Sequence, residues 1–304
     1  MAFLFNFDLC CTWIVNQAKK IKVLTDSSVL LTPKEIEQYS ITIVPLSVEV
    51  NGKNYIDGKN ISRDELIEML RVGSIPKTSQ PSLGRFVEAF NELGKDGSQV
   101  VAILLSDVLS GTVSAAQQAA DMTKTDVTVI NSKSTDRGEA FQVLAAAEDA
   151  ALGKTIEYIK LHCAEIYKRT TVHVLIDNLD CLVAGGRVSK MMGAVTKLVN
   201  IKVVAELKDK SLDVVSKGRN TKSWFKYCQK LKEQLKDKKL QALALPHVAA
   251  DNSIMEKIKD IFLHDNPTAD FIQELTSPII MTHTGLKAIG LITLTEKPVI
   301  ETEK

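Results

Sequence analysis

The chain has 304 residues, of which 45% are hydrophobic and 25% are charged. These values are ordinary for a globular protein and leave room for one large domain or two modest ones with a buried core. Lys and Arg total 38 against 37 Asp and Glu, so the formal net charge is +1 and no one-signed field is expected to attract nucleic acid.

The chain begins with an apolar stretch, Met1 to Val15, that is rich in Phe, Leu, Ile, Cys and Trp. It has no early positive charge and no clear small-residue cleavage site, so it is a poor signal peptide. Asn6 and Asp8 interrupt it, and it is too short to cross a bilayer. We predict that residues 1–20 are a poorly ordered or surface-docked appendage, with a weak membrane-surface contact as the alternative, and we expect no stable membrane insertion elsewhere.

Strands and helices alternate through the first half of the chain. Two capping boxes, Thr32–Glu35 and Ser62–Glu65, each predict the start of a helix. The wholly apolar run Val100–Leu105 is typical of a central parallel strand. Further strands are expected at 21–24, 41–50 and 127–130, an extended segment at 75–82, and helices at 83–93 and 112–122. This pattern predicts an N-terminal α/β domain, residues 21–160, with a mostly parallel sheet flanked by helices.

The second half has a mixed pattern, which predicts a C-terminal mixed α/β domain, residues 161–304. A long amphipathic helix is expected at 155–169, and residues 179–199 are expected to be mostly helical with a break at Gly185-Gly186. Strands are expected at 172–176, 201–207, 212–216, 240–245, 269–274 and 288–293, and helices at 222–235 and 254–263. His283 follows an apolar run, and we expect it at the end of a strand.

Three hydroxyl-rich loops stand out in the first half: Asp26-Ser27-Ser28, Thr78–Ser82 and Ser110-Gly111-Thr112. Loops at the carboxyl ends of parallel strands surround the ligand crevice, and a helix N-terminus there favours an anion. The sequence has no GxxxxGK[ST] and no GxGxxG, and few cations accompany the loops, so the pattern favours a carboxylate over a polyphosphate. The alternative is that they are ordinary helix caps and a tight turn.

Two further motifs, Gly185-Gly186-Arg187 and His283-Thr284-Gly285, could bring a cation and an imidazole to such a ligand. Their alternatives are a helix break with a surface arginine and a loop histidine without a ligand. A serine hydrolase using Ser110 and His283 is a further alternative, although the sequence has no G-x-S-x-G elbow.

Cysteine and histidine spacing gives no sign of a metal or a disulfide framework. The five cysteines are odd in number and lack a CxxC pair, and the five histidines form no HxxxH or HxH pair. We therefore predict reduced thiols, a cytoplasmic location, no metal and no cofactor.

Taken together, several blocks resemble the DegV family of bacterial lipid-binding proteins over residues 21–293. The likeness comes from Thr25-Asp26-Ser27-Ser28, Pro45-Leu46-Ser47-Val48, Tyr55-Ile56-Asp57-Gly58, Thr78-Ser79-Gln80-Pro81-Ser82, Leu109-Ser110-Gly111-Thr112, Gly185-Gly186-Arg187 and His283-Thr284-Gly285. The resemblance implies a two-domain α/β protein that holds a long-chain fatty acid in a pocket between or within the domains. Some members of the family serve a fatty acid kinase, whose separate ATP-binding subunit phosphorylates the bound carboxylate.

The resemblance also implies roles for individual residues. By motif, the carboxylate contacts would be Thr78, Ser79, Ser110 and His283. The arginine near the pocket mouth would be Arg187, and Arg219, in Lys217–Thr221, would dock the kinase subunit. On this view the chain is a lipid-binding protein and not an enzyme by itself. The alternatives are a transport or regulatory lipid-binding protein without a kinase partner, or a Ser-dependent hydrolase.

Overall fold

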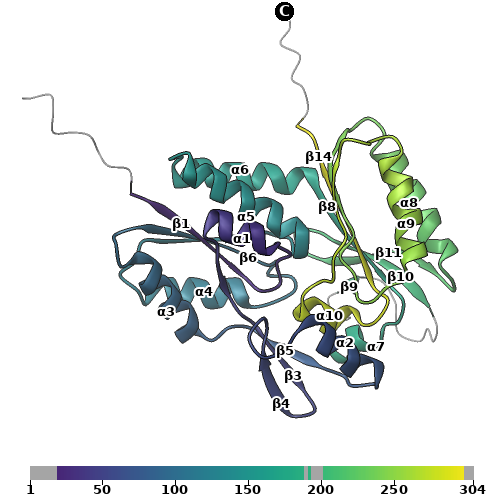
Figure 1. Ribbon diagram of the computed structural model, residues 1–304, viewed down its shortest axis with the longest axis horizontal. Helices are drawn as coiled ribbons and strands as arrows, with labels where there is room; N and C mark the ends of the chain where they lie inside the picture. Colours follow the sequence, from purple (N-terminus) through teal and green to yellow (C-terminus); the bar gives the residue numbers. More distant parts are fainter. Residues whose placement is uncertain (1–18, 188–190, 193–200, 298–304) are drawn as a thin grey trace, which may run out of the picture.

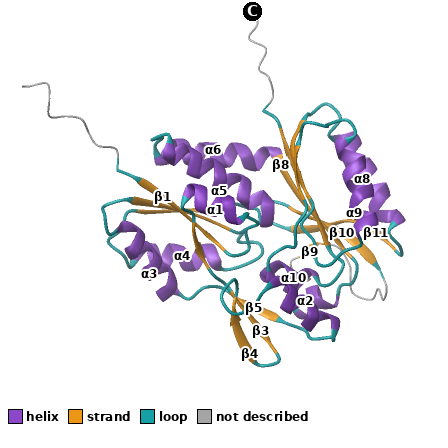
Figure 2. Cartoon of the chain, in the orientation of Figure 1, coloured by secondary structure: helices purple, strands orange, loops and turns teal. Residues whose placement is uncertain are grey.

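The computed structural model describes residues 19–187, 191–192 and 201–297, which form three sheets and the helices that cover them (Figures 1 and 2). The predicted appendage, residues 1–20, lies outside the described residues except for its last two positions. The described part confirms the predicted α/β class, with a parallel sheet in the first half and a mixed sheet in the second.

The first sheet is parallel, with strand order β2-β1-β6-β7. Its strands are β1 (Ile21–Asp26), β2 (Thr42–Val44), β6 (Gln99–Leu104) and β7 (Val127–Asn131). Its helices are α1 (Pro33–Tyr39), α3 (Leu83–Gly94), α4 (Thr112–Asp121), α5 (Asp136–Ala151) and α6 (Ile156–Arg169). As a capping box dictates, the Thr32 hydroxyl accepts from the Glu35 amide and the Glu35 carboxylate accepts from the Thr32 amide.

Both faces of this sheet are buried, which explains why the inner strand β6 is apolar at every position from Val100 to Leu104. On β6, Val101 and Ile103 pack in one cluster with α5 and α6, while Val100 and Ala102 pack in another with α3 and α4. Figure 1 shows α1, α5 and α6 on one side of the strands and α3 and α4 on the other. The sheet therefore presents its loops, and not its faces, to a ligand.

A small antiparallel sheet, β4-β3-β5, projects from the first one. It consists of β3 (Ser47–Val50), β4 (Lys53–Ile56) and β5 (Lys77–Ser79), and α2 (Arg63–Arg71) and α10 (Pro278–Thr284) pack against it. Because α10 comes from the far end of the chain, this contact ties the two halves of the sequence together. The contact includes Val48 of β3 and Met281 of α10, both fully buried.

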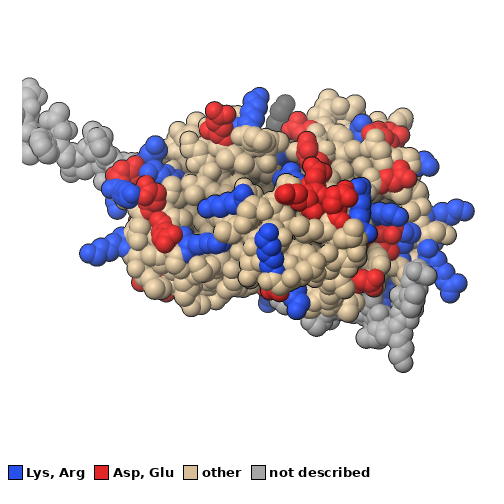
Figure 3. All heavy atoms as spheres, turned by 60° about the horizontal axis from the view of Figure 1, so that its bottom comes forward, with Lys and Arg blue, Asp and Glu red and all other residues tan. Residues whose placement is uncertain are grey.

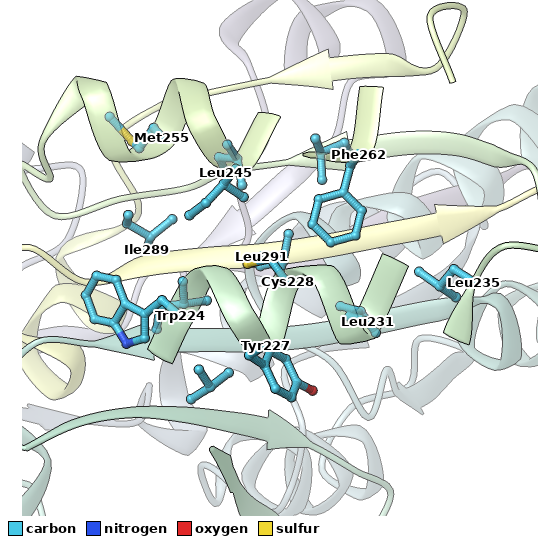
Figure 4. Close-up of a cluster of buried hydrophobic side chains, with 14 of the residues drawn as sticks. Trp224, Tyr227, Cys228, Leu231, Leu235, Leu245, Met255, Phe262, Ile289 and Leu291 are labelled. Atoms are coloured by element: carbon cyan, nitrogen blue, oxygen red, sulfur yellow. The ribbon is translucent and has the colours of Figure 1, made fainter. Parts of the chain in front are cut away.

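The third sheet has the strand order β13-β12-β14-β8-β10-β11-β9 and is mostly antiparallel. Its strands are β8 (Thr170–Ile176), β9 (Met191–Met192), β10 (Lys202–Leu207), β11 (Leu212–Gly218), β12 (Leu240–Ala244), β13 (Asp270–Ile272) and β14 (Ile289–Thr295). One face carries α8 (Lys222–Gln234) and α9 (Asn252–Leu263). Figure 4 shows Trp224 and Leu231 of α8 and Phe262 of α9 gathered over Leu291 of β14.

Three secondary-structure predictions are wrong. The strand expected at 41–50 is two strands in different sheets, β2 and β3. In the stretch 179–199, the helix α7 (Asp180–Ala184) ends before the glycines and Met191–Met192 forms β9; residues 188–190 and 193–200 lie outside the described part. His283 lies in the last turn of α10 and not at a strand end, because the Ser277 hydroxyl caps a helix that has Pro278 at its first position.

The predicted domain boundary between residues 160 and 161 falls inside α6 and stays a prediction. The side chains of Ile159 and Cys163 on this helix pack with the first sheet and α5. The last residue of the helix, Arg169, donates through Nη1 to the side chain of Gln241 on β12. The helix therefore contacts both large sheets.

The surface carries charges of both signs. In the face shown in Figure 3, Lys and Arg side chains are interspersed with Asp and Glu. None of the helices in residues 19–187 and 201–297 combines the length and apolar character needed to cross a membrane. In the same described segments, no group of three or more His, Cys, Asp or Glu side chains has the arrangement needed to hold a metal ion.

Candidate functional site

A cavity lies where the three sheets meet, and its empty volume is about 920 Å³, open solvent at the mouth included. Val172 and Val174 of β8 and Ile292 of β14 form one wall. These residues alternate along their strands with Leu175 and Leu291, which face α8 and α9 instead. The period of two therefore gives the third sheet one face for its own helices and one for the cavity.

Other walls come from all parts of the fold. Leu109 follows β6, Leu182 lies on α7, Ile279 lies on α10, and Leu46 precedes β3. A cavity with mostly aliphatic walls and a smaller number of polar groups suits an apolar ligand. Four of the six residues predicted for the site lie on this lining: Thr78, Ser110, Arg187 and His283.

Thr78 and His283 are in direct contact. The Thr78 Oγ1 atom lies 2.8 Å from Nε2 of His283, although the two residues are 205 positions apart. Thr78 is held on β5 opposite Val48 of β3, and His283 is held by α10, which packs on the same small sheet. The fold thus joins two motifs from opposite ends of the chain.

The His283 ring is held uncharged by its surroundings. Burial lowers its pKa to about 3, and the positive charge of Arg187 acts in the same direction. Its Nδ1 atom is buried without a hydrogen-bond partner among the described residues. Because the imidazole and the threonine hydroxyl bond to each other, the pair leaves one donor for an acidic head group: the Thr78 hydroxyl when Nε2 carries the proton, or Nδ1–H of His283 when Nδ1 does.

Ser110 lies in the turn between β6 and α4. Its backbone amide donates to the Ser106 carbonyl at 3.2 Å, and its hydroxyl lies 2.9 Å from the Thr112 hydroxyl. Gly111 lies against the hydroxyl-rich loop Thr78–Ser82, since a Cβ on Gly111 would come within 2.3 Å of Oε1 of Gln80 in that loop. Two of the three predicted hydroxyl loops therefore touch each other at the cavity.

Arg187 is tied to the same turn. Its Nε donates to the Leu109 carbonyl at 3.1 Å, and Nη1 donates to the Gly185 carbonyl at 2.7 Å. Burial lowers the pKa of the guanidinium, which nevertheless stays charged at neutral pH. Within the described residues, the cavity lining thus carries the cation of Arg187 beside several neutral donors, a combination that suits a single carboxylate.

Two predicted residues lie elsewhere. Ser79 follows Thr78 on β5, so its side chain points to the opposite side; it is exposed and does not line the cavity. Arg219 follows β11 and is exposed. The roles predicted for these two residues, and for the four on the lining, stay predictions.

The third predicted loop, Asp26-Ser27-Ser28, also lies outside the cavity. The Asp26 carboxylate accepts from the backbone amides of Ser28, at 2.9 Å, and Leu105, at 2.8 Å. Glu139 accepts from the hydroxyls of Thr25 and Ser28, and burial raises the pKa of Glu139 well above its usual range. Asp26 and Ser28 thus brace the strand ends of the first sheet.

The cavity also contains polar residues that the sequence reasoning missed. Asp136 follows β7, adopts a left-handed φ of 56° and accepts from the Thr276 hydroxyl. Burial raises its pKa to about 6. The sequence did contain a sign of this residue, because the loop after the strand Val127–Asn131 is also at the carboxyl end of a parallel strand, where ligand-binding residues are expected.

The hydroxyl of Ser110 and the ring of His283 have different partners. Ser110 bonds to Thr112, whereas His283 bonds to Thr78, and no described residue accepts from His283 Nδ1. A Ser-His-acid triad requires the serine on one ring nitrogen and an acid on the other. The arrangement found here differs on both counts.

Stability should depend on His283 in acid. An unfolded histidine has a pKa near 6.5, so between pH 6.5 and about 3 the unfolded chain takes up a proton that the folded chain refuses, and stability is lost as the pH falls. We expect wild-type protein to lose about 2–3 kcal/mol relative to His283→Gln between pH 7 and pH 4.5. Urea unfolding of both proteins at the two pH values measures this difference. If the difference in unfolding free energy between the wild type and His283→Gln were the same at both pH values, it would contradict the lowered pKa of His283.

A family model, related sequences and solved structures all show similarity to the DegV family. The family model described as "Uncharacterised protein, DegV family" matches residues 20–296. A DegV domain-containing protein of Streptococcus pneumoniae serotype 4 is 36% identical over 274 residues, which cover 90% of this chain and 98% of that protein.

Solved structures are similar in the same way. The crystal structure of DegV from Bacillus subtilis, described as a fatty acid binding protein, superposes with a TM-score of 0.83 at 26% identity, covering 91% of this chain and 100% of that one. A stearic acid-binding protein from Eubacterium ventriosum superposes with a TM-score of 0.77 at 25% identity, covering 90% and 98%.

Proposed function

The chain belongs to the DegV family, and from this premise we infer that it binds a long-chain fatty acid in the cavity described above. The observation that carries the proposal is the convergence of Thr78, Ser110, Arg187 and His283 on one aliphatic cavity. The acyl chain would lie against β8 and β14, and the carboxylate would accept from the hydroxyls and pair with the arginine. Fatty acid binding by the relatives from Bacillus subtilis and Eubacterium ventriosum supports this assignment.

The energetics of burial support a lipid as the ligand. Each buried methylene contributes about 0.8 kcal/mol, so roughly 14 of them supply on the order of 11 kcal/mol before ordering costs. Ordering the flexible chain offsets part of this. The polar groups then need to contribute mainly orientation, because the aliphatic wall already provides most of the affinity.

The direct test is to identify what the purified protein carries. Lipid extraction and mass spectrometry of protein purified from cells should reveal a long-chain fatty acid in near-stoichiometric amount. Protein that emerges without lipid and does not take up added palmitate or oleate would overturn the proposal.

Gly185 offers a way to disturb His283 without touching it. A Cβ on Gly185 would come within 2.2 Å of His283 Nδ1, while the φ of Gly185, −74°, is open to any residue. We expect Gly185→Ala to displace the ring from Thr78 and weaken fatty acid binding about tenfold, as loss of one charged hydrogen bond would. The measurement is displacement of a fluorescent fatty acid.

The matched control is Gly84→Ala on α3, where the new Cβ would have no neighbour nearer than 4.0 Å. This variant should bind the fatty acid as the wild type does. Equal affinities for Gly185→Ala and Gly84→Ala would remove the His283 ring from the carboxylate site.

We further propose that the chain presents the bound carboxylate to a separate ATP-dependent fatty acid kinase subunit and does not itself catalyse the transfer. The family resemblance supports this step. The different hydrogen-bond partners of Ser110 and His283 do not favour the alternative of a Ser-dependent hydrolase. Free thiols at Cys163, Cys181 and Cys228 support a cytoplasmic location for such a pair of proteins.

Arg219 provides the test of this partnership, because it is exposed and lies outside the fatty acid cavity. We expect Arg219→Ala to lower acyl phosphate formation by the kinase subunit about tenfold, the effect of losing one interfacial charge pair, while fatty acid affinity is unchanged. Arg71→Ala, an exposed arginine on α2, is the control. Unaltered turnover with Arg219→Ala would exclude this residue from docking.

A further inference from the structure

A second cavity lies at the N-terminal end of α10, near the carboxyl end of β1. Its empty volume is about 840 Å³, with the open solvent at its mouth included. Among the described residues, six polar ones line it: Ser27 of the loop after β1, Asp57 and Lys59 of the segment after β4, Ser62 and Arg63 at the start of α2, and Ser277 before α10. None of these residues lines the fatty acid cavity.

Asp57 has an unfulfilled hydrogen-bonding capacity. Its side chain is buried, with only 6% of the residue exposed, and its Oδ2 atom has no hydrogen-bond partner among the described residues. The other contacts of the carboxylate are with the Ser27 hydroxyl and the Gly58 amide. A buried acceptor without a donor is costly, so an oxygen left open at the wall of a cavity points to a donor that arrives with a ligand.

Arg63 lines the same cavity with its positive charge. Its guanidinium is close enough to lower the pKa of Asp57 and of Asp136 by charge, yet no side chain or carbonyl in the described residues accepts a hydrogen bond from it. Nearby Arg137, by contrast, donates from Nη1 and Nη2 to both oxygens of Glu35, at 2.9 and 2.7 Å. Arg63 therefore has its planar pair of donors available for an anion.

The remainder of the wall is aliphatic. Val29 and Leu31 follow β1, Ile43 lies on β2, and Ile61 precedes α2. A single unpaired carboxylate is too few ligands for a metal ion, and a fatty acid would leave Asp57 without a donor. The cavity thus combines the carboxylate of Asp57, the guanidinium of Arg63 and an apolar wall. This combination matches a small molecule that has one positive charge, one negative charge and an apolar substituent.

We propose that this second cavity binds a small zwitterion with an apolar substituent, the chemical class of the apolar α-amino acids. The ammonium group donates to Oδ2 of Asp57, the carboxylate pairs with the guanidinium of Arg63, and the substituent packs against Val29 and Ile43. This site is independent of the fatty acid proposal.

Helix α10 contributes residues to both cavities. Pro278, at its start, lines the second cavity, whereas Ile279, Ile280 and His283 line the first. Retention of the fatty acid therefore reports whether a variant in the second cavity has kept α10 in place.

The test is calorimetric titration of the full chain with L-leucine and L-phenylalanine, and with two truncated probes of leucine. 3-Methylbutylamine lacks the carboxylate and 4-methylpentanoate lacks the ammonium group. We expect saturable binding of at least one of the two amino acids and binding of each truncated probe at least about tenfold weaker than L-leucine. Asp57→Asn and Arg63→Gln should each weaken amino acid binding at least about tenfold.

Arg71→Gln, on the exposed side of α2, is the matched control and should bind the amino acids as the wild type does. Fatty acid retention and melting temperature should be unchanged in all three variants, which separates loss of the ligand from loss of the fold. The proposal is overturned if neither amino acid saturates below about 10 mM, if 3-methylbutylamine binds as tightly as leucine, or if Asp57→Asn has no effect.

Discussion

Val174→Trp should almost abolish fatty acid binding. Val174 lies in the middle of β8 with its side chain on the wall of the first cavity. An indole at this position would occupy the space of several methylenes, and exclusion of about four of them removes roughly 3 kcal/mol, or about 200-fold in affinity. Because the new side chain fills an existing space, overpacking should cost about 1–3 kcal/mol and leave the protein folded. The measurements are co-purified lipid and affinity for added palmitate.

The control for this result is the same substitution at a surface valine. Val72, which follows α2, is 82% exposed and lies outside the cavity. Val72→Trp should retain its fatty acid. If Val174→Trp remained folded and carried as much lipid as Val72→Trp, the acyl chain could not lie against β8.

The combined change Thr78→Ala plus Ser110→Ala should weaken fatty acid binding about 100-fold. A hydrogen bond to a charged group is worth about 1.5–3 kcal/mol, and this change removes two donors from the lining. The double change should weaken contacts with the carboxylate of the ligand and leave contacts with its acyl chain unchanged. A long-chain alcohol should therefore bind nearly as well to the variant as to the wild type. Parallel titrations with palmitate and hexadecanol separate the two contributions.

Ser79→Ala is the matched control, since it removes a hydroxyl from the next residue of the same strand. The family resemblance places Ser79 at the carboxylate, whereas the structure leaves it exposed and off the cavity lining. We expect no change in affinity. An effect of Ser79→Ala equal to that of the double variant would restore Ser79 to the site and require β5 to shift on ligand binding.

Features that depend on a few neighbouring residues were predictable from the sequence. The capping boxes at Thr32 and Ser62 predict two helix starts, and the structure shows both sets of reciprocal bonds. The run Val100–Leu105 predicts a strand covered on both faces, as found for β6. In each case the stabilising contacts are local, or depend only on which faces are buried, so the pattern of residues is sufficient.

Secondary-structure predictions failed where a short segment is too uniformly apolar to show the periodicity of a helix or of a strand. The run Pro278–Met281 fits a buried strand or a helix equally well, and the cap from Ser277 and its burial against β3 make it a helix. The continuous stretch 41–50 divides because Val44 ends β2 in the parallel sheet while Ser47 begins β3 in another. Sheet membership is a matter of long-range pairing, which a local pattern does not encode.

By itself the sequence determined which residue types could hold a carboxylate, the order of their loops and the α/β class, because these follow from local composition and periodicity. The tertiary structure alone decided that Thr78 meets His283 across 205 residues, that Ser79 faces away, and that Ser27 and Asp57 line a different cavity from Ser110. The physical reason is that a site is made by side chains that converge in space. That convergence depends on how the three sheets and α10 surround one cavity, and not on any segment considered alone.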